Sequence, residues 1–298
     1  MAMLSGNNKT FDRYLGERDG PTFLSTMDGL NAAREEIVEF IRRTVVDANA
    51  EGVVVAMSGG IDSTLTAALA AEALGSDRVL GLSLPASKTD SVHAQEARTI
   101  ADGFGIDFQE IQLKPLLETF ETVVGAALGD DADRVATGNV LARLRMLCAY
   151  YAANTRSLLV LGTSNRSELL LGYYTKYGDG AADLFPLGDL YKTEVRALAP
   201  HAGVPRRIIS KPPTGGLWSG QTDEAELGAG YRTLDRLLRL LVDREYDIEA
   251  AAERVDVPVE TADDVATMYL DGAHKRTLPP MPGIGERNDD RSRQPFYR

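Results

Sequence analysis

The chain has 298 residues, enough for one large domain or two modest ones with a sizeable hydrophobic core. Hydrophobic residues make up 44% and charged residues 26%, which excludes a disordered chain, a collagen-like repeat and a disulfide scaffold. The formal net charge of −12 repels a polyanion, so we expect no sequence-independent binding of nucleic acid.

Helices and strands alternate along the first half of the chain. After a polar N-terminal extension over residues 1–25, apolar positions at helical spacing predict a helix over Leu30 to Val46. The β-branched run from Gly52 to Met57 is typical of a strand that is buried on both faces. A helix over Ile61 to Leu74 and a strand over Arg78 to Leu84 follow.

The alternation continues with a helix over Asp90 to Phe104, a strand over Ile106 to Ile111, a helix over Val135 to Asn154 and a strand over Leu158 to Leu161. Right-handed crossovers of this length place helices on both faces of a parallel sheet. We therefore predict an α/β fold with a doubly wound parallel sheet.

The pattern changes after the last predicted strand. Residues 172–189 and 210–222 are glycine- and proline-rich loops, and short helices follow to about Leu270. Long loops in a compact domain are more often functional than accidental. We predict a single domain over residues 26–280 with a C-terminal helical segment, followed by a polar C-terminal tail over 281–298.

No signal for a membrane or for secretion is present. No window approaches about 18 uninterrupted apolar residues, and the N-terminus lacks the apolar core of a signal peptide. We therefore expect a cytoplasmic protein with no membrane partner. The single cysteine, Cys148, and three histidines offer no metal-ligand spacing, so any metal ion must be held by oxygen atoms.

The first candidate site is the segment Ser58-Gly-Gly-Ile-Asp-Ser63, between a predicted strand and a predicted helix. Its glycines allow a ligand to approach closely, and its amides, helix N-terminus and serine hydroxyls can donate to an anion. We interpret the segment as a phosphate site; the alternative is a tight turn in which Asp62 only complements the helix dipole. An acidic residue in a phosphate cradle requires a cation, so Asp62 predicts magnesium.

The second candidate segment, Gly162 to Glu168, follows the strand over Leu158 to Leu161. Ligands of open parallel sheets lie beyond the carboxyl ends of the strands, so this segment is expected to face the crevice that holds the phosphate loop. Glu168 is then a second candidate magnesium ligand. The spacing of Asn165 and Glu168 also fits a capping box, which alone would account for both residues.

Three later segments are unusual for plain surface loops. Gly172 to Asp183 carries three tyrosines, a lysine and two acids, which suits a ligand with aromatic rings and ribose hydroxyls. Lys211 to Glu224 has a proline pair, glycines and the only tryptophan, which indicates either a lid or an ordinary crossover. Asp271 to Arg276 is either an anion-binding patch or a helix C-terminus neutralised by cations. Lys192 also fits an ordinary exposed position on a helix over residues 190–199.

The phosphate loop resembles that of the adenine-nucleotide α-hydrolase-like ATP pyrophosphatases, which adenylate a substrate and release pyrophosphate. The segments KYGDG, KPPTGGLWSGQTDE and HKR, in this order, resemble the ammonia-dependent NAD synthetase family over about residues 28 to 280. The helix segment from Gly138 to Met146 also fits that family. The resemblance implies ATP-dependent amidation of deamido-NAD by ammonia through an NAD-adenylate intermediate, yielding NAD, AMP and pyrophosphate in the final step of NAD biosynthesis.

The same resemblance implies roles for individual residues. ATP would contact Ala56, Met57, Ser58, Gly59, Gly60, Ile61, Asp62, Ser63, Thr163, Lys192 and Thr214. Magnesium would be bound by Asp62 and Glu168. Deamido-NAD would contact Arg143, Lys176, Asp183, His274 and Lys275. The catalytic residues would be Asp62, Lys192 and Asp179, the last as our hypothesis for the carboxylate that attracts ammonium and takes its proton.

The family also implies a homodimer in which helices such as 135–154 pair across an isologous interface. Two other functions stay open: another adenylating ligase or thiolase of the same superfamily, and a non-catalytic adenine-nucleotide sensor. A sensor could dispense with Asp62, Glu168 and Lys192 together, whereas this chain has all three. We expect no glutaminase domain, since Cys148 lies in an apolar helical run that indicates a core residue rather than a nucleophile.

Overall fold

The computed structural model describes residues 24–129, 133–214 and 222–280. Most of the predicted N-terminal extension, the predicted C-terminal tail and the central part of the predicted lid, including Trp218, lie outside the described residues. The division of the chain into extension, domain and tail stays a prediction.

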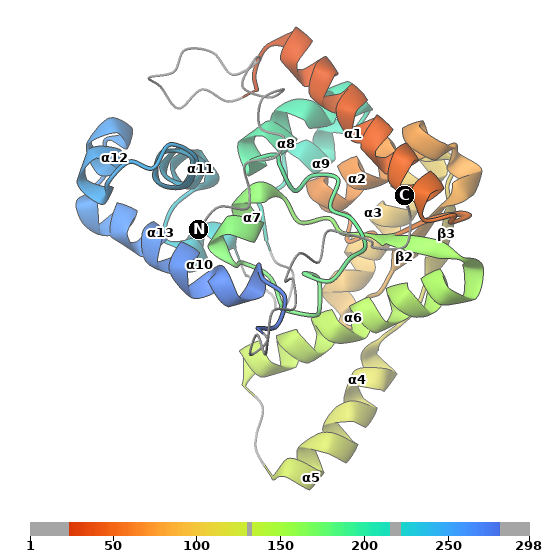
Figure 1. Ribbon diagram of the computed structural model, residues 1–298. Helices are drawn as coiled ribbons and strands as arrows, with labels where there is room; N and C mark the ends of the chain where they lie inside the picture. Colours follow the sequence, from red (N-terminus) through yellow and green to blue (C-terminus); the bar gives the residue numbers. More distant parts are fainter. Residues whose placement is uncertain (1–23, 130–132, 215–221, 281–298) are drawn as a thin grey trace, which may run out of the picture.

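A four-stranded parallel sheet with the strand order β3-β2-β1-β4 forms the centre of the molecule (Figure 1). The strands are β1 (Gly52–Ala56), β2 (Val79–Ser83), β3 (Asp107–Glu110) and β4 (Leu158–Leu161). A parallel bridge between Leu161 and Leu184 continues the pairing beyond β4. The predicted α/β fold is confirmed, and each predicted strand coincides with an observed one.

Helices connect these strands. In the first half of the chain they are α1 (Met27–Asp47), α2 (Ile61–Leu74), α3 (Lys88–Phe104), α4 (Lys114–Phe120), α5 (Ala126–Leu128) and α6 (Arg134–Arg156). In the second half they are α7 (Arg166–Leu171), α8 (Lys192–Leu198), α9 (Arg206–Ile209), α10 (Asp223–Leu227), α11 (Tyr231–Leu238), α12 (Ile248–Val255) and α13 (Val259–Asp271). Short helical turns are η2 (Ser76–Arg78), η3 (Glu121–Gly125), η4 (Ala199–Ala202), η5 (Arg239–Asp243) and η6 (Gly272–Lys275).

Both faces of the sheet are covered, as the continuous apolar run of β1 requires. Val53 and Val55 pack into a core shared with α1, α2, α3 and α8, whereas Val54 packs into the core beneath α6. Because successive side chains of a strand point to opposite faces, a run of three valines fills both cores. The doubly wound arrangement follows from this pattern.

The strand order reverses between β1 and β4, which are paired neighbours. Within the sheet, β2 pairs with one edge of β1 and β4 pairs with the other edge. A reversal of this kind opens a crevice at the carboxyl ends of the two strands, where ligands bind in open α/β sheets. The loops 57–60 and 162–165 therefore meet at one place.

The C-terminal helices form a separate core around α11, with Leu234, Leu237 and Leu238 fully buried. Leu170 and Leu171 of α7 belong to the same core, so the C-terminal helices pack against the helix that follows β4. Figure 1 shows the helices α10 to α13, coloured from cyan to blue, gathered beside α7. The predicted C-terminal helical segment is confirmed.

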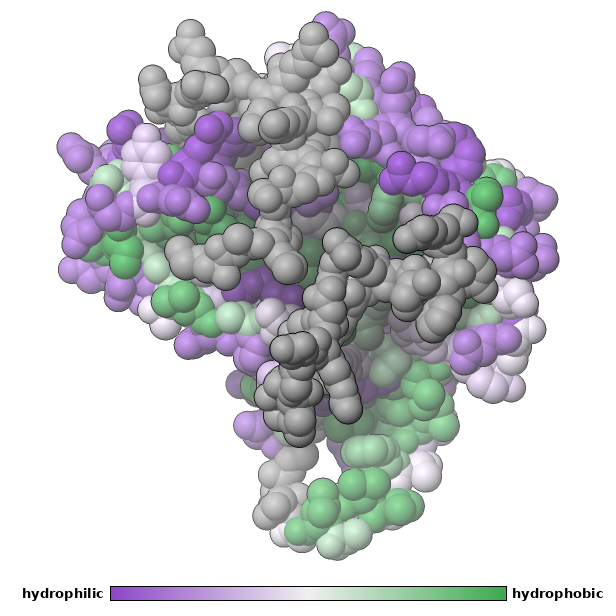
Figure 2. All heavy atoms as spheres, in the orientation of Figure 1, coloured by the Kyte–Doolittle hydropathy of each residue, from purple (hydrophilic) through white to green (hydrophobic). Residues whose placement is uncertain are grey.

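The arm formed by α4, η3 and α5 projects away from the sheet and has no counterpart in the sequence prediction (Figure 1). Its large apolar side chains at Leu116, Phe120, Val123 and Leu128 are exposed. Figure 2 shows a hydrophobic surface at the tip of this arm. No helix among residues 24–129, 133–214 and 222–280 is long and apolar enough to span a membrane.

Candidate functional site

The loop between β1 and α2 is closed by its own serines. The Ser58 N–H donates to Ser63 Oγ at 3.2 Å, and the Gly60 N–H donates to Ser58 Oγ at 3.3 Å. Gly60 is the N-cap of α2 and offers no capping side chain, so the first amides of the helix receive no side-chain cap. The loop thus offers the main-chain donors that a phosphate needs.

Gly59 occupies a position that only glycine fits well. Its φ of +74° lies in the left-handed region, and a Cβ atom built there would stand 2.8 Å from the carbonyl oxygen of His93. The segment at the start of α3 therefore packs directly against the phosphate loop. Any side chain at Gly59 would push these two segments apart.

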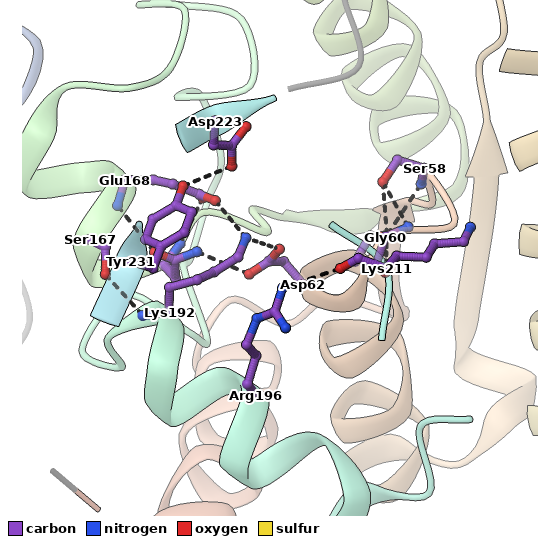
Figure 3. Close-up of polar contacts among 12 residues, drawn as sticks. Ser58, Gly60, Asp62, Ser167, Glu168, Lys192, Arg196, Lys211, Asp223 and Tyr231 are labelled. Carbon is purple, nitrogen blue, oxygen red and sulfur yellow. Dashed lines mark hydrogen bonds and ion pairs between the residues drawn. The ribbon is translucent and has the colours of Figure 1, made fainter. Parts of the chain in front are cut away.

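Lys192 lies between two carboxylates at the base of this loop (Figure 3). Its Nζ is 2.6 Å from Asp62 Oδ2 and 3.0 Å from Glu168 Oε1. The residue is only 3% exposed. The alternative of an ordinary exposed helix residue at Lys192 is therefore wrong.

Asn165 binds the remaining oxygens of the same two carboxylates. Its Nδ2 donates to Asp62 Oδ1 at 3.0 Å, and its backbone N–H donates to Glu168 Oε2 at 3.2 Å. Asn165 Oδ1 accepts from the Glu168 N–H at 3.1 Å, which completes a capping box at the start of α7. The capping interpretation is thus confirmed for one oxygen of Glu168, while its other oxygen faces Lys192.

Two carboxylates and one ammonium share this buried place, which shifts their pKa values. Burial alone favours loss of the lysine proton, but Asp62 and Glu168 hold the pKa of Lys192 above its ordinary value. Burial, reinforced by Asp62 and opposed by Lys192, raises the pKa of Glu168 to about 7. Paired groups with such shifts are typical of functional sites.

The backbone at Lys192 is held by a buried carboxylate from α11. The Lys192 N–H donates to Ser167 Oγ at 2.9 Å, and Ser167 Oγ donates to Asp235 Oδ1 at 2.5 Å. Asp235 Oδ2 accepts from the Thr193 N–H at 2.8 Å, and Asp235 is fully buried. Asp235 therefore fixes the start of α8 from another helix.

An aromatic ring completes the surroundings of Lys192. The Tyr231 ring centre lies 5.2 Å from Lys192 Nζ, and the Tyr231 hydroxyl donates to Asp223 Oδ2 at 2.9 Å. Sequence reasoning missed Tyr231 and Asp235, because neither belongs to a motif, and it gave no role to Asp223, although Asp223 lies in the segment Lys211 to Glu224. Only the tertiary packing of α11 against α7 and α8 reveals Tyr231 and Asp235, whereas Asp223 lies at the start of α10.

The donor set of Asp62 and Glu168 fits magnesium in combination with a nucleotide. Mg²⁺ prefers oxygen ligands and is usually held by one or two carboxylates together with substrate phosphates. Within the described part of the chain there is no group of three or more His, Cys, Asp or Glu side chains suited to hold a metal ion. The two carboxylates at the phosphate loop, Asp62 and Glu168, therefore match the number expected for a metal ion that binds together with ATP.

A cavity of about 210 Å³ opens next to this cluster. It is lined by Ala56, Met57, Ser58, Gly59, Gly60, Ile61, Asp62, Leu82, Ser83, Leu84, Pro85, His93, Ala94, Arg145, Lys192, Arg196, Ile208, Lys211, Pro212, Pro213 and Thr214. The structure thus brings most of the predicted ATP contacts into one pocket.

Three further basic residues line this cavity and were not among the ATP contacts predicted from the sequence. Arg145 lies two residues after Arg143 on α6, and Arg196 lies one turn after Lys192 on α8. Lys211 Nζ donates to the Gly59 carbonyl at 3.3 Å and pairs with Glu96. Helical spacing from Lys192 and the lysine before the proline pair were the available signals.

A second group of basic residues gathers where α6, the 172–183 loop and η6 meet. Arg143 Nη2 donates to the Lys176 carbonyl at 3.2 Å, and Lys176 Nζ donates to the His274 carbonyl at 2.5 Å. Lys275 Nζ donates to the carbonyls of Gly172 and Tyr174 at 2.6 and 2.9 Å. Four of the five residues predicted to contact deamido-NAD therefore lie close together.

The other predicted residues lie on the loops that follow β4. Asp183 accepts from the Val160 N–H at 2.7 Å and from the Tyr150 hydroxyl at 3.3 Å, so it also ties this loop to the edge of the sheet. Burial, reinforced by Asp183, raises the pKa of Tyr150 to about 12. Asp179 is exposed and accepts from the Thr175 N–H at 2.9 Å, while Thr163 is half-buried directly after β4.

Comparison with protein families shows that the model described as NAD synthase matches residues 33–279. The chain is 46% identical to the NH(3)-dependent NAD(+) synthetase of Methanocaldococcus jannaschii over 84% of its own length and 95% of that protein. It is 45% identical to the NH(3)-dependent NAD(+) synthetase of Thermococcus kodakarensis over 84% of its length and 96% of that protein.

Solved structures give the same result. An NMN synthetase from Francisella tularensis matches with a TM-score of 0.71 and 32% identity, covering 86% of this chain and 99% of that one. The NH3-dependent NAD synthetase from Campylobacter jejuni, solved with a nitrate ion, matches with a TM-score of 0.71 and 27% identity. The match covers 85% of this chain and 98% of the C. jejuni chain.

Proposed function

Because the chain belongs to the NAD synthase family, it is a carbon–nitrogen ligase, and we propose that Lys192 and Asp62 contact the ATP that drives its reaction and that Asp62 and Glu168 bind the magnesium ion of this ATP. The reaction is the ATP-dependent amidation of deamido-NAD by ammonia, the final step of NAD biosynthesis. One observation carries the assignment of residues. The buried cluster of Lys192 between two carboxylates adjoins the phosphate loop at the point where the strand order reverses.

Adenylation explains why such an enzyme needs ATP. A nicotinate carboxylate does not react with ammonia, because oxide would have to leave. When a carboxylate oxygen attacks the α-phosphorus, the bond from that phosphorus to pyrophosphate breaks and an acyl adenylate forms. Ammonia then attacks the acyl carbon, and AMP leaves in place of oxide. The amides of the phosphate loop and the Lys192 ammonium, which line the same cavity, would stabilise the departing pyrophosphate, and no covalent bond to the enzyme is required.

Asp62 and Glu168 would hold magnesium, which supplies charge neutralisation at the phosphates when it is bound. Lys192, Thr163 and Thr214 would contact the same triphosphate. Thr214 and Lys192 line the cavity beside the phosphate loop, and Thr163 follows β4 at the same edge of the sheet. The arrangement supports one nucleotide site that is built from both halves of the domain.

The basic group formed by Arg143, Lys176, His274 and Lys275 would bind deamido-NAD, whose own phosphates are anionic. Asp183, beside this group, would also contact the substrate. We assign the capture and deprotonation of ammonium to Asp179, which lies exposed on the same loop.

The homodimer implied by the family agrees with the exposed apolar surface of the molecule. Leu147 and Tyr151, one turn apart on α6, are 60% and 72% exposed. The apolar arm adds Val123 and Leu128, which are also exposed. Exposed large apolar side chains that gather on one element are typical of protein interfaces. ATP and deamido-NAD are metabolites of the cell interior, which supports a cytoplasmic location.

The residue assignment is tested by the release of pyrophosphate. We expect Asp62→Asn and Glu168→Gln to reduce deamido-NAD-dependent release at least about 100-fold, since each removes a charge from the proposed metal site. Asp189→Asn is the matched control, because Asp189 is an exposed carboxylate on the segment that precedes Lys192. Undiminished release by the first two variants would refute the assignment.

The same assay separates the acid substrates. The wild-type enzyme is expected to release pyrophosphate with deamido-NAD far faster than with nicotinate mononucleotide, the corresponding acid of the Francisella tularensis NMN synthetase. A preference for nicotinate mononucleotide would instead indicate that the chain is an NMN synthetase.

A further inference from the structure

Every oxygen of the Asp62 and Glu168 carboxylates has a partner within the protein. One oxygen of each faces Lys192 Nζ, at 2.6 and 3.0 Å, and the other oxygen of each accepts from Asn165. The cluster is thus internally satisfied, as Figure 3 shows for the contacts of Lys192. The buried Lys192 ammonium acts as the bridge between the two carboxylates.

A divalent cation bound to this pair would need the oxygens that Lys192 now uses. Magnesium binds oxygen at about 2.1 Å and needs close, nearly octahedral coordination, so an ammonium that is hydrogen-bonded to both carboxylates weakens its binding to these oxygens. Two cations a few ångström apart would also repel strongly in a buried place. Lys192 and the metal ion therefore oppose each other's binding at the bridging position.

We propose that Lys192 and the divalent cation compete for the Asp62 and Glu168 carboxylates, so that the metal enters this site only together with the triphosphate. This inference rests on the proposed function, which assigns the two carboxylates to the metal. The triphosphate supplies the new acceptor that Lys192 needs when it leaves the carboxylates, and phosphate oxygens complete the coordination of the metal.

The surroundings of Lys192 restrict this exchange to its side chain. The backbone N–H of Lys192 is bonded to Ser167 Oγ, which Asp235 holds in turn. The Tyr231 ring, 5.2 Å from Nζ, stays beside the ammonium and is a neutral partner that a cation tolerates. The side chain can therefore turn from the carboxylates to a phosphate without a shift of α8.

The competition is tested with Mn²⁺, whose binding is followed by electron paramagnetic resonance in the absence of nucleotide. We expect Lys192→Gln to bind Mn²⁺ at least about tenfold more tightly than the wild type, because the competing charge is gone. Lys192→Arg is the matched control, since it keeps a positive charge beside the carboxylates, and it should bind as weakly as the wild type. Lys192→Met repeats the test if the glutamine variant does not fold.

Two further variants separate this inference from the proposed function. The added Mn²⁺ affinity of Lys192→Gln should disappear when Asp62→Asn is combined with it. Equal Mn²⁺ affinity of the wild type and the folded Lys192→Gln variant without nucleotide would overturn the competition. The metal assignment would still stand if Mn²⁺ binding in the presence of α,β-methylene ATP depends on Asp62. If binding with that nucleotide is unchanged by Asp62→Asn and Glu168→Gln, the metal assignment itself fails.

Discussion

The partners of Lys192 come from distant parts of the chain. Asp62 is 130 residues away and follows β1, whereas Glu168 is 24 residues away and follows β4. The parallel pairing of β1 and β4 brings the two carboxylates to one edge of the sheet. At the scale of single residues, the chemistry of the site therefore depends on which residues follow the carboxyl ends of two adjacent strands.

Gly59 is the residue of the phosphate loop whose replacement the structure restricts most clearly. We expect Gly59→Ala to lower the free energy of unfolding by about 1–3 kcal/mol and to weaken ATP binding, because of its positive φ and the contact with His93. The measurement is chemical unfolding together with titration of α,β-methylene ATP.

Gly203→Ala is the control for this effect. Gly203 also has a positive φ, of +77°, but a Cβ there would meet nothing within 4 Å. Gly203→Ala should lower the free energy of unfolding only by the strain of a positive φ at an alanine, and it should leave nucleotide binding unchanged. Equal effects of the two substitutions on binding would show that the contact with His93 is irrelevant.

At the scale of elements, α11 fixes the start of α8. We expect Asp235→Ala to lower kcat by at least about tenfold with little change in KM for ATP, because Lys192 then loses its defined backbone position. The measurement is steady-state kinetics on the folded variant, with ATP and deamido-NAD varied separately.

Asp247→Ala provides the comparison, because Asp247 caps α12 by accepting from the Ala250 N–H at 2.7 Å. Loss of this cap should cost about 1 kcal/mol of stability without a loss of kcat. The positioning role of Asp235 would be refuted if its loss lowered stability alone.

Glu194 of α8 gives a prediction for the pH dependence of stability. Burial raises its pKa above the ordinary 4.5, against hydrogen bonds from the N–H groups of Leu24 and Tyr191. The folded protein then binds this proton more tightly than the unfolded chain does. Its contribution to stability is full below pH 4.5 and is lost as the pH rises through the raised pKa.

The test compares the wild type with Glu194→Gln by denaturant unfolding from about pH 4 to about pH 8. As the pH rises, the unfolding free energy of the wild type should fall relative to that of Glu194→Gln. A constant difference over this interval would show that Glu194 has the same pKa in both states.

At the scale of the whole molecule, the fold could be predicted because its signals are local. The valines of β1 and the apolar spacing of α2 and α6 indicate the covered parallel sheet directly. The burial of Lys192 could not be predicted, since helical spacing does not tell which neighbour a face meets. Tyr231 and Asp235 stayed hidden for the same reason, because only the docking of α11 brings them to the site.

The apolar arm and α6 lead to a prediction about assembly. We expect the wild type to be a dimer in sedimentation equilibrium and Leu147→Glu to shift it to a monomer, because a charge would be buried in the interface. Val92→Glu, at a position on α3 that is 65% exposed, should leave the dimer intact. A monomeric wild type would contradict the homodimer.

The central claim is that the bond broken in ATP lies next to its α-phosphorus and that the carboxylate of deamido-NAD attacks this atom. The direct measurement is a turnover with ATP, magnesium, ammonium and deamido-NAD labelled with ¹⁸O in its carboxylate. The account predicts NAD, AMP and pyrophosphate in equal amounts, with one labelled oxygen in AMP. Formation of ADP and phosphate, or of AMP without the label, would contradict it.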